Sequence, residues 1–248
     1  MTTGPRRLEE LTLNSSAPPG QLLYDGWLLR FSPGKAKRAR SVNPVYASTL
    51  PLGEKVDYCE RLYGGRGLPA IFRLSEPTMP AGLEECLAAR GYERFETTQV
   101  REAAIDPAAL AGPEVGHPRL EEWFDLVGGL RGSPIAHRTA HLARLAALPL
   151  PMRTAAILEG AAAVATGLAI REGEHVGLFD VVTREDCRRR GLARTIVAAL
   201  LRWGREGGAA RSYLQVEEGN APAIALYDRF GFTLAYRYWY RGRPQEAE

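Results

Sequence analysis

The segment Phe179–Arg194 limits the possible folds of this chain more than any other stretch. An apolar run ends near Thr183, a short polar loop follows, and Gly191 begins a stretch that repeats apolar residues on one face of a helix. A strand that turns through a short loop into a helix directs several backbone N–H groups to the helix start, where the helix dipole is positive. The segment therefore predicts a loop that binds phosphate.

The residues of this loop suit a phosphate group in two ways. Gly191 has no Cβ and Ala193 carries only a methyl group, so an anion can approach the backbone closely. The formal net charge of the whole chain is only +3, which does not indicate a duplex or membrane partner. Positive charge is nevertheless concentrated here, in four arginines that can add charge-assisted bonds to a pyrophosphate: Arg188, Arg189, Arg190 and Arg194.

Periodicity on both sides of the loop predicts alternating strands and helices. A helix over Gly191–Arg205 separates the strand His175–Thr183 from the strand Ser212–Glu217. Two strands joined by a crossover helix imply parallel pairing, so the fold class is α/β. The other predicted strands are Trp27–Phe31, Ser41–Val45, Leu68–Leu74, Arg94–Ala103, Arg153–Glu159, Ala162–Arg171 and Phe232–Arg241, and the other predicted helices are Glu54–Tyr63, Ala81–Arg90, Leu120–Leu130, Arg138–Leu148 and Pro222–Phe230.

The length of 248 residues suits two modest domains or one large one. Residues 1–20 are expected to be a polar lead-in. The stretch 106–118 contains three prolines and two glycines and is predicted to be a linker. It separates an N-terminal domain, residues 21–105, from a C-terminal domain, residues 119–248.

Several classes of protein are not indicated. No run of 18 or more apolar residues is present and the N-terminus lacks the pattern of a secretory signal, so the protein is expected to be cytoplasmic. The cysteines are odd in number and far apart, which fits reduced thiols better than disulfides or a zinc site. They are Cys59, Cys86 and Cys187.

Two histidines have the i, i+4 spacing of a zinc-binding helix. In His137-Arg-Thr-Ala-His141, however, Arg138 replaces the glutamate of the HExxH motif. A metalloprotease is not predicted, and no metal cofactor is expected.

The loop and the segments after it resemble one enzyme superfamily. Arg188-x-x-Gly191-x-Ala193 matches the Q/R-x-x-G-x-G/A motif of the GNAT acetyltransferases, which bind the pyrophosphate of acetyl-CoA with it. Leu214–Asn220 resembles the fifth strand of that family and its trailing asparagine, and Ala223–Phe232 resembles its last helix. The resemblance covers about residues 120–240 and implies a GNAT fold with a mixed sheet.

This resemblance implies that acetyl-CoA is the cosubstrate and that a primary amine accepts the acetyl group. The backbone N–H of Val181 would polarise the acetyl carbonyl, and Val182 and Thr183 would lie along the pantetheine arm. Asn220 would hydrogen-bond the cofactor or the neighbouring loop, and Ala223 would leave room for the thiol end. The backbone amides that would hold the pyrophosphate belong to Arg188, Arg189, Arg190, Gly191, Leu192, Ala193 and Arg194.

By the same resemblance, Tyr227 would protonate or steady the departing CoA thiolate. A phenol with a pKa near 10 is protonated at neutral pH and can donate. Acetyl transfer from a thioester also needs a neutral amine and a stabilised oxyanion. Neither a nucleophile elbow nor a Cys/His signature is present, so we expect direct attack by the amine in a ternary complex rather than a covalent enzyme intermediate.

The general base is the least defined part of the predicted site. Asp180 is a candidate because it is a carboxylate within an apolar strand, where an unpaired charge is costly. If Val181 faces the acetyl group, Phe179 shares that side and Asp180 points away, unless a bulge re-aims it. Glu217, near the end of the next parallel strand, is a second candidate. A chain of water molecules would need neither carboxylate.

The N-terminal half shows one echo of the C-terminal half. At an offset of 140 residues Gly91 aligns with Gly231, and each follows a helix end and precedes an aromatic residue that enters a strand. The N-terminal domain is therefore expected to be a degenerate GNAT-like copy or a cap. Ser48, Pro80 and Leu87 stand where the loop arginine, the asparagine and the tyrosine would align, so no cofactor chemistry is expected there.

Two other classes of function stay open. A non-catalytic acyl-CoA-binding sensor would keep the loop but would not need Tyr227. A nucleic-acid-binding module would combine the arginine loop with the cationic turn Lys35–Arg40, which lacks interleaved aromatic residues. The expected partners are acetyl-CoA and a small-molecule or protein amine, without nucleic acid or membrane. The protein is expected to be a monomer or a homodimer.

Overall fold

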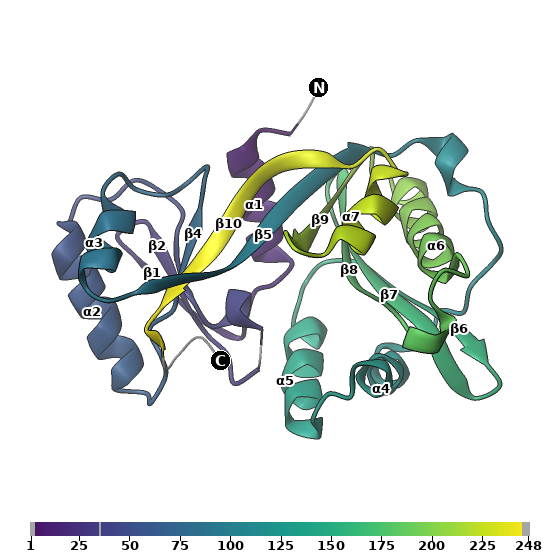
Figure 1. Ribbon diagram of the computed structural model, residues 1–248, viewed down its shortest axis with the longest axis horizontal. Coiled ribbons are helices and arrows are strands. Elements are labelled where there is room, and N and C mark those ends of the chain that lie inside the picture. Colours follow the sequence, from purple (N-terminus) through teal and green to yellow (C-terminus); the bar gives the residue numbers. More distant parts are fainter. Residues whose placement is uncertain (1–2, 35, 245–248) are drawn as a thin grey trace. The chain divides into compact units, whose positions relative to one another are not determined.

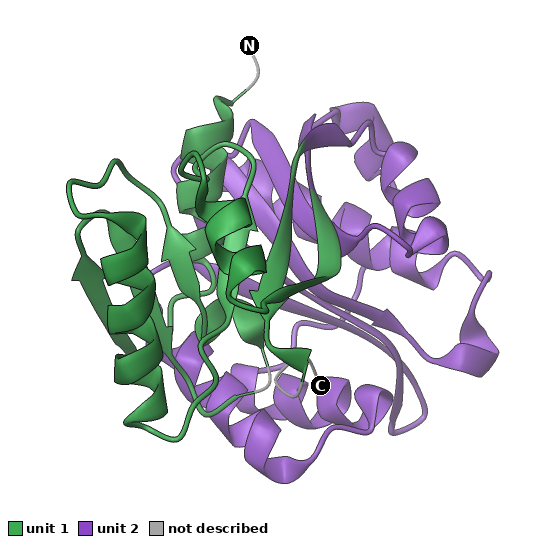
Figure 2. Ribbon diagram, turned by 60° about the vertical axis from the view of Figure 1, so that its left-hand side comes forward, with its two compact units in different colours: residues 1–99, 236–248 green, residues 100–235 purple. Residues whose placement is uncertain are grey.

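The computed structural model describes residues 3–34 and 36–244 and divides into two compact units. Unit 1 comprises residues 1–99 and 236–248, and unit 2 comprises residues 100–235 (Figure 2). Both boundaries fall inside strands, namely β5 (Glu93–Ala104) and β10 (Thr233–Gly242). Each of these two strands therefore contributes residues to both units.

Unit 1 contains α1 (Pro5–Asn14), β1 (Gly20–Tyr24), β2 (Trp27–Phe31), η1 (Lys37–Ala39), β3 (Val42–Pro44), α2 (Leu52–Gly64), β4 (Phe72–Ser75) and α3 (Leu83–Ala89). The strand order is β1-β2-β3-β4-β10. The first three strands form an antiparallel meander, β3 pairs with β4 in parallel, and β4 pairs with β10 antiparallel. Trp27, Phe72 and Leu87 are fully buried in the core of this unit.

Unit 2 contains η2 (Pro107–Leu110), α4 (Leu120–Arg131), α5 (Ile135–Ala146), β6 (Met152–Glu159), β7 (Ala162–Glu172), β8 (His175–Thr183), η3 (Glu185–Cys187), α6 (Leu192–Glu206), β9 (Arg211–Glu217) and α7 (Ala221–Asp228). The strand order is β5-β9-β8-β7-β6. The strands β6, β7 and β8 pair antiparallel, and β8 pairs with β9 in parallel. In Figure 1, α6 covers one face of this sheet and α4 and α5 lie at the other. The mixed α/β class is confirmed.

The two units share one order of elements. Each has three antiparallel strands, a helix, a strand parallel to the third, a second helix and a last strand. The last strands are exchanged, because β10 lies beside β4 in unit 1 and β5 lies beside β9 in unit 2. Gly91 and Gly231 both have positive φ, 80° and 76°, between the second helix and the last strand. This shared order supports a degenerate N-terminal copy, which stays a prediction.

A glycine in the sheet of unit 2 sets how closely α6 packs. Ile196 and Leu200 lie fully buried on the inner face of α6. A Cβ at Gly167 in β7 would lie 2.4 Å from Cγ2 of Ile196 and 2.9 Å from Cδ1 of Leu200. A side chain there would force these methyl groups to move, so Gly167 allows α6 to pack closely on the sheet.

The strands and helices predicted from Trp27 to Arg241 are present, with ends that shift by a few residues. Residues 5–14, expected within a polar lead-in, instead form α1, which begins with Pro5 in its first turn and buries Leu8 and Leu11. The strand β1 was not among the predicted strands, and its residues are mostly exposed. The stretch 106–118 contains η2 and a bridge between Gly116 and Ala156. The division into domains at this stretch stays a prediction.

In the part of the chain that the structure describes, no helix is both long enough and apolar enough to cross a membrane. The three cysteines are free thiols, as their spacing indicates. Of the cationic turn Lys35–Arg40, Lys35 lies outside the described residues. Lys37 forms an ion pair with Glu96 at 2.6 Å, and Arg38 donates to the Tyr238 hydroxyl at 3.4 Å.

Candidate active site

The strands β8 and β9 separate toward their C-terminal ends. They pair in parallel only as far as Leu178 and Leu214, although both strands continue, to residues 183 and 217. The edge of β8 that faces β9 therefore presents backbone N–H and C=O groups that an extended ligand can pair with. The predicted cofactor residues Val181, Val182 and Thr183 all lie on this stretch and are half-buried. The Thr183 hydroxyl is buried without a hydrogen-bond partner in the described chain, which fits a polar ligand.

A β-bulge interrupts β8 in the same stretch. On β7, Gly167 alone faces two residues of β8, Asp180 and Val181. Asp180 has a φ of 48°, a left-handed value uncommon outside glycine. The bulge places Asp180 with Phe179 on the face toward α4 and α5, whereas Val181 packs toward α6. The bulge is the exception under which Asp180 was expected to be re-aimed, and it places Phe179 and Val181 on opposite faces of the strand.

The Asp180 carboxylate meets side chains from α4 and α5. Its Oδ1 lies 2.8 Å from a guanidinium nitrogen of Arg131, and its Oδ2 lies 3.6 Å from Nε2 of His141. The Phe124 ring packs edge-on against the His141 ring, with centroids 4.9 Å apart. The Asp180 side chain is 13% exposed and that of Arg131 is 47% exposed. One predicted base is thus brought together with two residues that the sequence did not assign to the site.

This contact assigns a neighbour to one histidine of the i, i+4 pair on α5. Within residues 3–34 and 36–244, no group of three or more His, Cys, Asp or Glu side chains is arranged to hold a metal ion. His141 instead faces the carboxylate of Asp180. The spacing of the two histidines drew attention to His141 in the sequence, but only the folded structure shows that its neighbour is Asp180.

The start of α6 presents free backbone donors. Gly191 is the N-cap with a φ of 79°, and nothing lies within 4 Å of where its Cβ would be. The N–H of Thr195 donates to the Gly191 carbonyl at 3.0 Å. The amides of Leu192, Ala193 and Arg194 precede that bond and have no acceptor within the helix. These donors can meet an anion that approaches the helix start.

The four loop arginines are all exposed, and two of them form ion pairs. Arg190 lies 2.5 Å from a carboxylate oxygen of Glu159, and Arg188 lies 3.6 Å from one of Glu185. Exposed pairs of this kind contribute about 0–1 kcal/mol, so an incoming phosphate can replace them at small cost. The arginines that form no ion pair within the described chain are Arg189 and Arg194.

The remaining predicted residues lie on α7 and just before it. The Oδ1 of Asn220 accepts the N–H of Ala223 at 3.2 Å and so caps the helix. Its side-chain oxygen therefore serves the main chain of α7. Ala223 is half-buried and lies one helical turn before Tyr227.

Tyr227 is buried against the apolar core of unit 2. Only 8% of the residue is exposed, and its ring packs edge-on against Phe232 with centroids 5.8 Å apart. Burial raises the pKa of Tyr227 to about 12. The phenol therefore keeps its proton throughout the neutral range and is a donor rather than an acceptor of a proton.

Glu217, the second candidate base, stands apart from the Asp180 cluster. Its side chain is exposed at the end of β9, and its carbonyl accepts the N–H of Asn220 at 2.9 Å. Among the described residues, no contact joins it to Asp180, Arg131 or His141.

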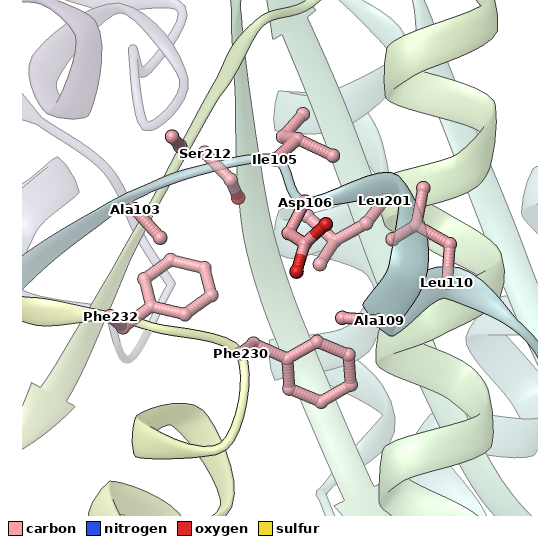
Figure 3. A pocket seen from close by; sticks show the side chains of 10 residues that line it. Ala103, Ile105, Asp106, Ala109, Leu110, Leu201, Ser212, Phe230 and Phe232 are labelled. Atoms are coloured by element: carbon pink, nitrogen blue, oxygen red, sulfur yellow. The ribbon is translucent and has the colours of Figure 1, made fainter.

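A shallow hollow elsewhere in unit 2 does not belong to this site. Figure 3 shows the Asp106 carboxylate there among the apolar side chains of Ile105, Leu201 and Phe230. Asp106 accepts the N–H of Ala108 at 2.9 Å and so caps η2. The hollow has no room for a water-sized molecule, and none of the predicted site residues lines it.

Unit 1 has a counterpart of the phosphate loop between β3 and α2, and a carboxylate of the chain itself fills it. Asp25, in the turn between β1 and β2, accepts the backbone N–H groups of Thr49 at 3.0 Å and Leu50 at 2.9 Å. The buried ammonium of Lys55 lies 3.1 Å from Asp25 Oδ2. The backbone bonds from Leu50 and Thr49 hold the pKa of Asp25 well below its usual range. The sequence did not reveal this contact, because Asp25 and Thr49 are far apart in the chain.

We expect Asp25→Asn to lower the melting temperature by several degrees at neutral pH, because an amide replaces an anion that accepts several donors. A lowered folded pKa means that the contribution of Asp25 is complete above the pKa of an unfolded aspartate and is lost as the pH falls through the lowered value. The gap between wild type and variant should therefore narrow in acid. Thermal unfolding at neutral pH and in acid checks this. The control is Asp57→Asn, because Asp57 on α2 forms a solvent-accessible ion pair with Arg90. Equal melting temperatures at neutral pH would contradict the role of Asp25.

Comparison with known proteins decides the family. A family model described as "Probable histone acetyltransferase Rv0428c C-terminal" matches residues 2–241. The chain belongs to this family. The match extends over both units and so well beyond the residues 120–240 that first showed the resemblance. One relative of this chain is the "Uncharacterized N-acetyltransferase YobR" of Bacillus subtilis. It is 28% identical over 246 residues, which are 95% of this chain and 97% of that protein.

Comparison with solved structures shows that this chain has the GNAT fold. A GCN5-related N-acetyltransferase from Kribbella flavida matches with a TM-score of 0.69 and 16% identity, covering 98% of this chain and 97% of that one. A tandem GNAT protein from the clavulanic acid biosynthesis pathway matches with a TM-score of 0.64 and 16% identity, covering 96% and 89%. The predicted GNAT fold is confirmed. Together with the N-acetyltransferase relatives, it makes the chain an acyltransferase of the GNAT type.

Proposed function

We propose that this acetyltransferase transfers the acetyl group of acetyl-CoA to a primary amine, which attacks directly in a ternary complex. The observation that carries the proposal is the separation of β8 and β9 just before the exposed amides at the start of α6. The first feature suits an extended polar arm and the second suits a pyrophosphate. Acetyl-CoA contains these two parts in series.

In this proposal the main chain of β8 holds the acyl arm. The groups of Val182 and Thr183 pair with the pantetheine amides as a neighbouring strand would, and the Thr183 hydroxyl gains a polar partner. The N–H of Val181 donates to the acetyl carbonyl and stabilises the negative charge that develops on its oxygen.

The start of α6 holds the pyrophosphate. The backbone donors come from Leu192, Ala193 and Arg194, and the side chains of the four loop arginines add charge-assisted bonds. Cys187, just before these arginines, is buried and accepts contacts from Arg184 and Arg190, so it holds the loop rather than reacting.

Tyr227 supplies the proton for the leaving thiolate. Its raised pKa keeps the phenol protonated at neutral pH, and it lies one turn beyond Ala223, whose small side chain leaves room for the sulfur. The alternative of a non-catalytic acyl-CoA sensor would use the same loop and would not need this donor.

Gly191→Ala tests the phosphate seat. We expect it to weaken acetyl-CoA binding about tenfold, because a Cβ would enter the space from which an anion approaches the amides. Gly208→Ala is the matched control, since Gly208 also has a positive φ, 94°, and follows the other end of α6, so that both variants carry the same backbone strain. Calorimetric titration with acetyl-CoA measures both. Equal affinity in the two variants would place the pyrophosphate elsewhere.

Asp25 leads to a second expectation of the proposed function. Because this carboxylate occupies the counterpart loop of unit 1, we propose that only unit 2 binds acetyl-CoA. The calorimetric titration should therefore give one acetyl-CoA per chain. A stoichiometry of two would show that unit 1 also binds it.

A further inference from the structure

The proposed steps leave the cluster of Asp180, Arg131 and His141 without a task. We propose that Asp180 and His141 bind the ammonium group of the acceptor and that His141 removes its proton, so that the acceptor is an alkylamine that is protonated at neutral pH. This inference rests on the proposed function and names its substrate class and its base.

The backbone at Asp180 places the carboxylate where an acceptor would meet the acetyl group. Without the bulge opposite Gly167, the alternation of β8 would turn Asp180 into the apolar core beneath α6. The left-handed φ of 48° is a strained backbone conformation for a residue other than glycine. Strain of this kind persists where function needs the side chain aimed in one direction. Here it aims the carboxylate away from α6, on the residue that directly precedes Val181, whose N–H the proposed function assigns to the acetyl carbonyl.

The distance between the two acceptor-facing atoms suits a nitrogen between them. Oδ2 of Asp180 and Nε2 of His141 are 3.6 Å apart, longer than a direct hydrogen bond. A nitrogen at about 2.9 Å from both atoms completes a triangle with good hydrogen-bond lengths. Arg131 holds the other oxygen, Oδ1, at 2.8 Å and so orients the carboxylate with Oδ2 toward the acceptor.

The two side chains divide the work by their chemistry. Asp180 supplies the negative charge that selects an ammonium group. A neutral imidazole accepts a proton at Nε2, so His141 can take a proton from the bound ammonium and pass it to solvent after each turnover. The edge-on contact with Phe124 holds the imidazole plane in place. Glu217 is exposed at the end of the other strand and takes no part.

The protons and bonds balance as follows. The ammonium group gives one proton to Nε2 of His141, and the neutral nitrogen attacks the thioester carbon, forming a C–N bond. As the C–S bond breaks, the sulfur takes a proton from Tyr227, and the second proton lost by the nitrogen restores the phenol through solvent. The products are an N-alkyl acetamide, CoA thiol and one proton, which leaves from His141.

Two probes of different basicity test this assignment. We would measure CoA thiol release at neutral pH with 2-phenylethylamine, which is protonated, and with O-methylhydroxylamine, whose nitrogen is already neutral. His141→Gln should lower kcat with the alkylamine about 10²-fold and change kcat with the alkoxyamine by less than about threefold. Asp180→Asn should raise KM for the alkylamine about tenfold and not for the alkoxyamine. His137→Gln, one turn earlier on α5, is the matched control and should leave both rates unchanged.

A second measurement separates catalysis from a structural role. Adding imidazole to His141→Ala should restore part of the rate with 2-phenylethylamine, which a packing role would not allow. Equal losses with the two probes, an unchanged rate in His141→Gln, or no effect of imidazole would each overturn the inference while the wild type remained active. A wild type that binds acetyl-CoA but releases no thiol with any amine would overturn the proposed function itself.

Discussion

Tyr227→Phe is expected to lower kcat for acetyl transfer about 10²-fold and to change the Kd for acetyl-CoA by no more than about twofold. The substitution removes only the hydroxyl and keeps the ring contact with Phe232. In the wild type, burial raises the pKa of Tyr227 to about 12, so the phenol keeps its proton over the whole neutral range. Under the proposed function, the substitution removes only the proton donor for the leaving thiolate. Thiol release at saturating acetyl-CoA gives kcat, and calorimetry gives Kd.

A second buried tyrosine provides the control for this variant. Tyr92, in unit 1, is 2% exposed and donates to Glu60 at 2.9 Å, so Tyr92→Phe also removes a buried hydroxyl. We expect Tyr92→Phe to keep the wild-type kcat. Full activity of Tyr227→Phe with every acceptor amine would contradict the assignment of Tyr227 as the proton donor.

Glu9→Gln is expected to lower the free energy of unfolding by about 3 kcal/mol and the melting temperature by about 6–12 °C. Glu9 on α1 and Arg73 on β4 are both 1% exposed and form a bidentate ion pair. The Tyr236 hydroxyl donates to Glu9 Oε2 at 2.6 Å. Removing the negative charge leaves the Arg73 guanidinium buried without its counter-charge, which is among the costliest single changes in a protein. Thermal and urea unfolding measure the loss.

The neighbouring residue is the control, and pH gives a further check. Glu10 is only partly buried and pairs with the exposed Arg7, so Glu10→Gln should cost less than about 1 kcal/mol. Burial alone would raise the pKa of Glu9, but the charge and hydrogen bonds of Arg73 hold it below its usual value. The contribution of Glu9 is therefore complete above the pKa of an unfolded glutamate and is lost as the pH falls through the lowered value. A variant as stable as the wild type at neutral pH would contradict this account.

The parts of the fold that the sequence predicted are those with local signals. The helix α6 is predicted by the helical spacing of its apolar residues, by Gly191 before it and by the glycine pair after it. The strands β6, β7 and β8 are apolar runs bounded by turn residues, and they were predicted nearly to the residue. In each case neighbours within a few positions decide the conformation, so a single sequence is sufficient.

The parts that the sequence did not predict depend on contacts between distant residues. In α1, Leu8 and Leu11 have helical spacing, but their burial depends on the rest of unit 1, and Pro5 with the adjacent arginines resembles a solvated tail. The exchange of β5 and β10 is a matter of which strand edge each one pairs with, and such pairing joins residues far apart in the chain. Asp25 meets the loop before α2 through a contact between residues 24 positions apart in the chain.

The candidate site shows the same division between local and distant signals. The backbone donors at Gly191 follow from the loop motif, whereas the orientation of Asp180 depends on a bulge opposite Gly167 that alternation cannot foresee. His141 was noticed only as half of a metal-like pair, because its contact with Asp180 joins α5 to β8. Residue type suggested the chemistry, and the tertiary contact supplied the partner.

The most direct test of the central claim is to incubate the chain with acetyl-CoA and a panel of primary amines, including peptides with a free N-terminus or lysine, and to follow thiol release together with product mass. The account predicts release of CoA thiol in equal amount with an acetylated amine for at least one acceptor, and loss of that rate in Tyr227→Phe. Binding of acetyl-CoA without thiol release or acetylated product across the whole panel would contradict it and would indicate an acyl-CoA sensor instead.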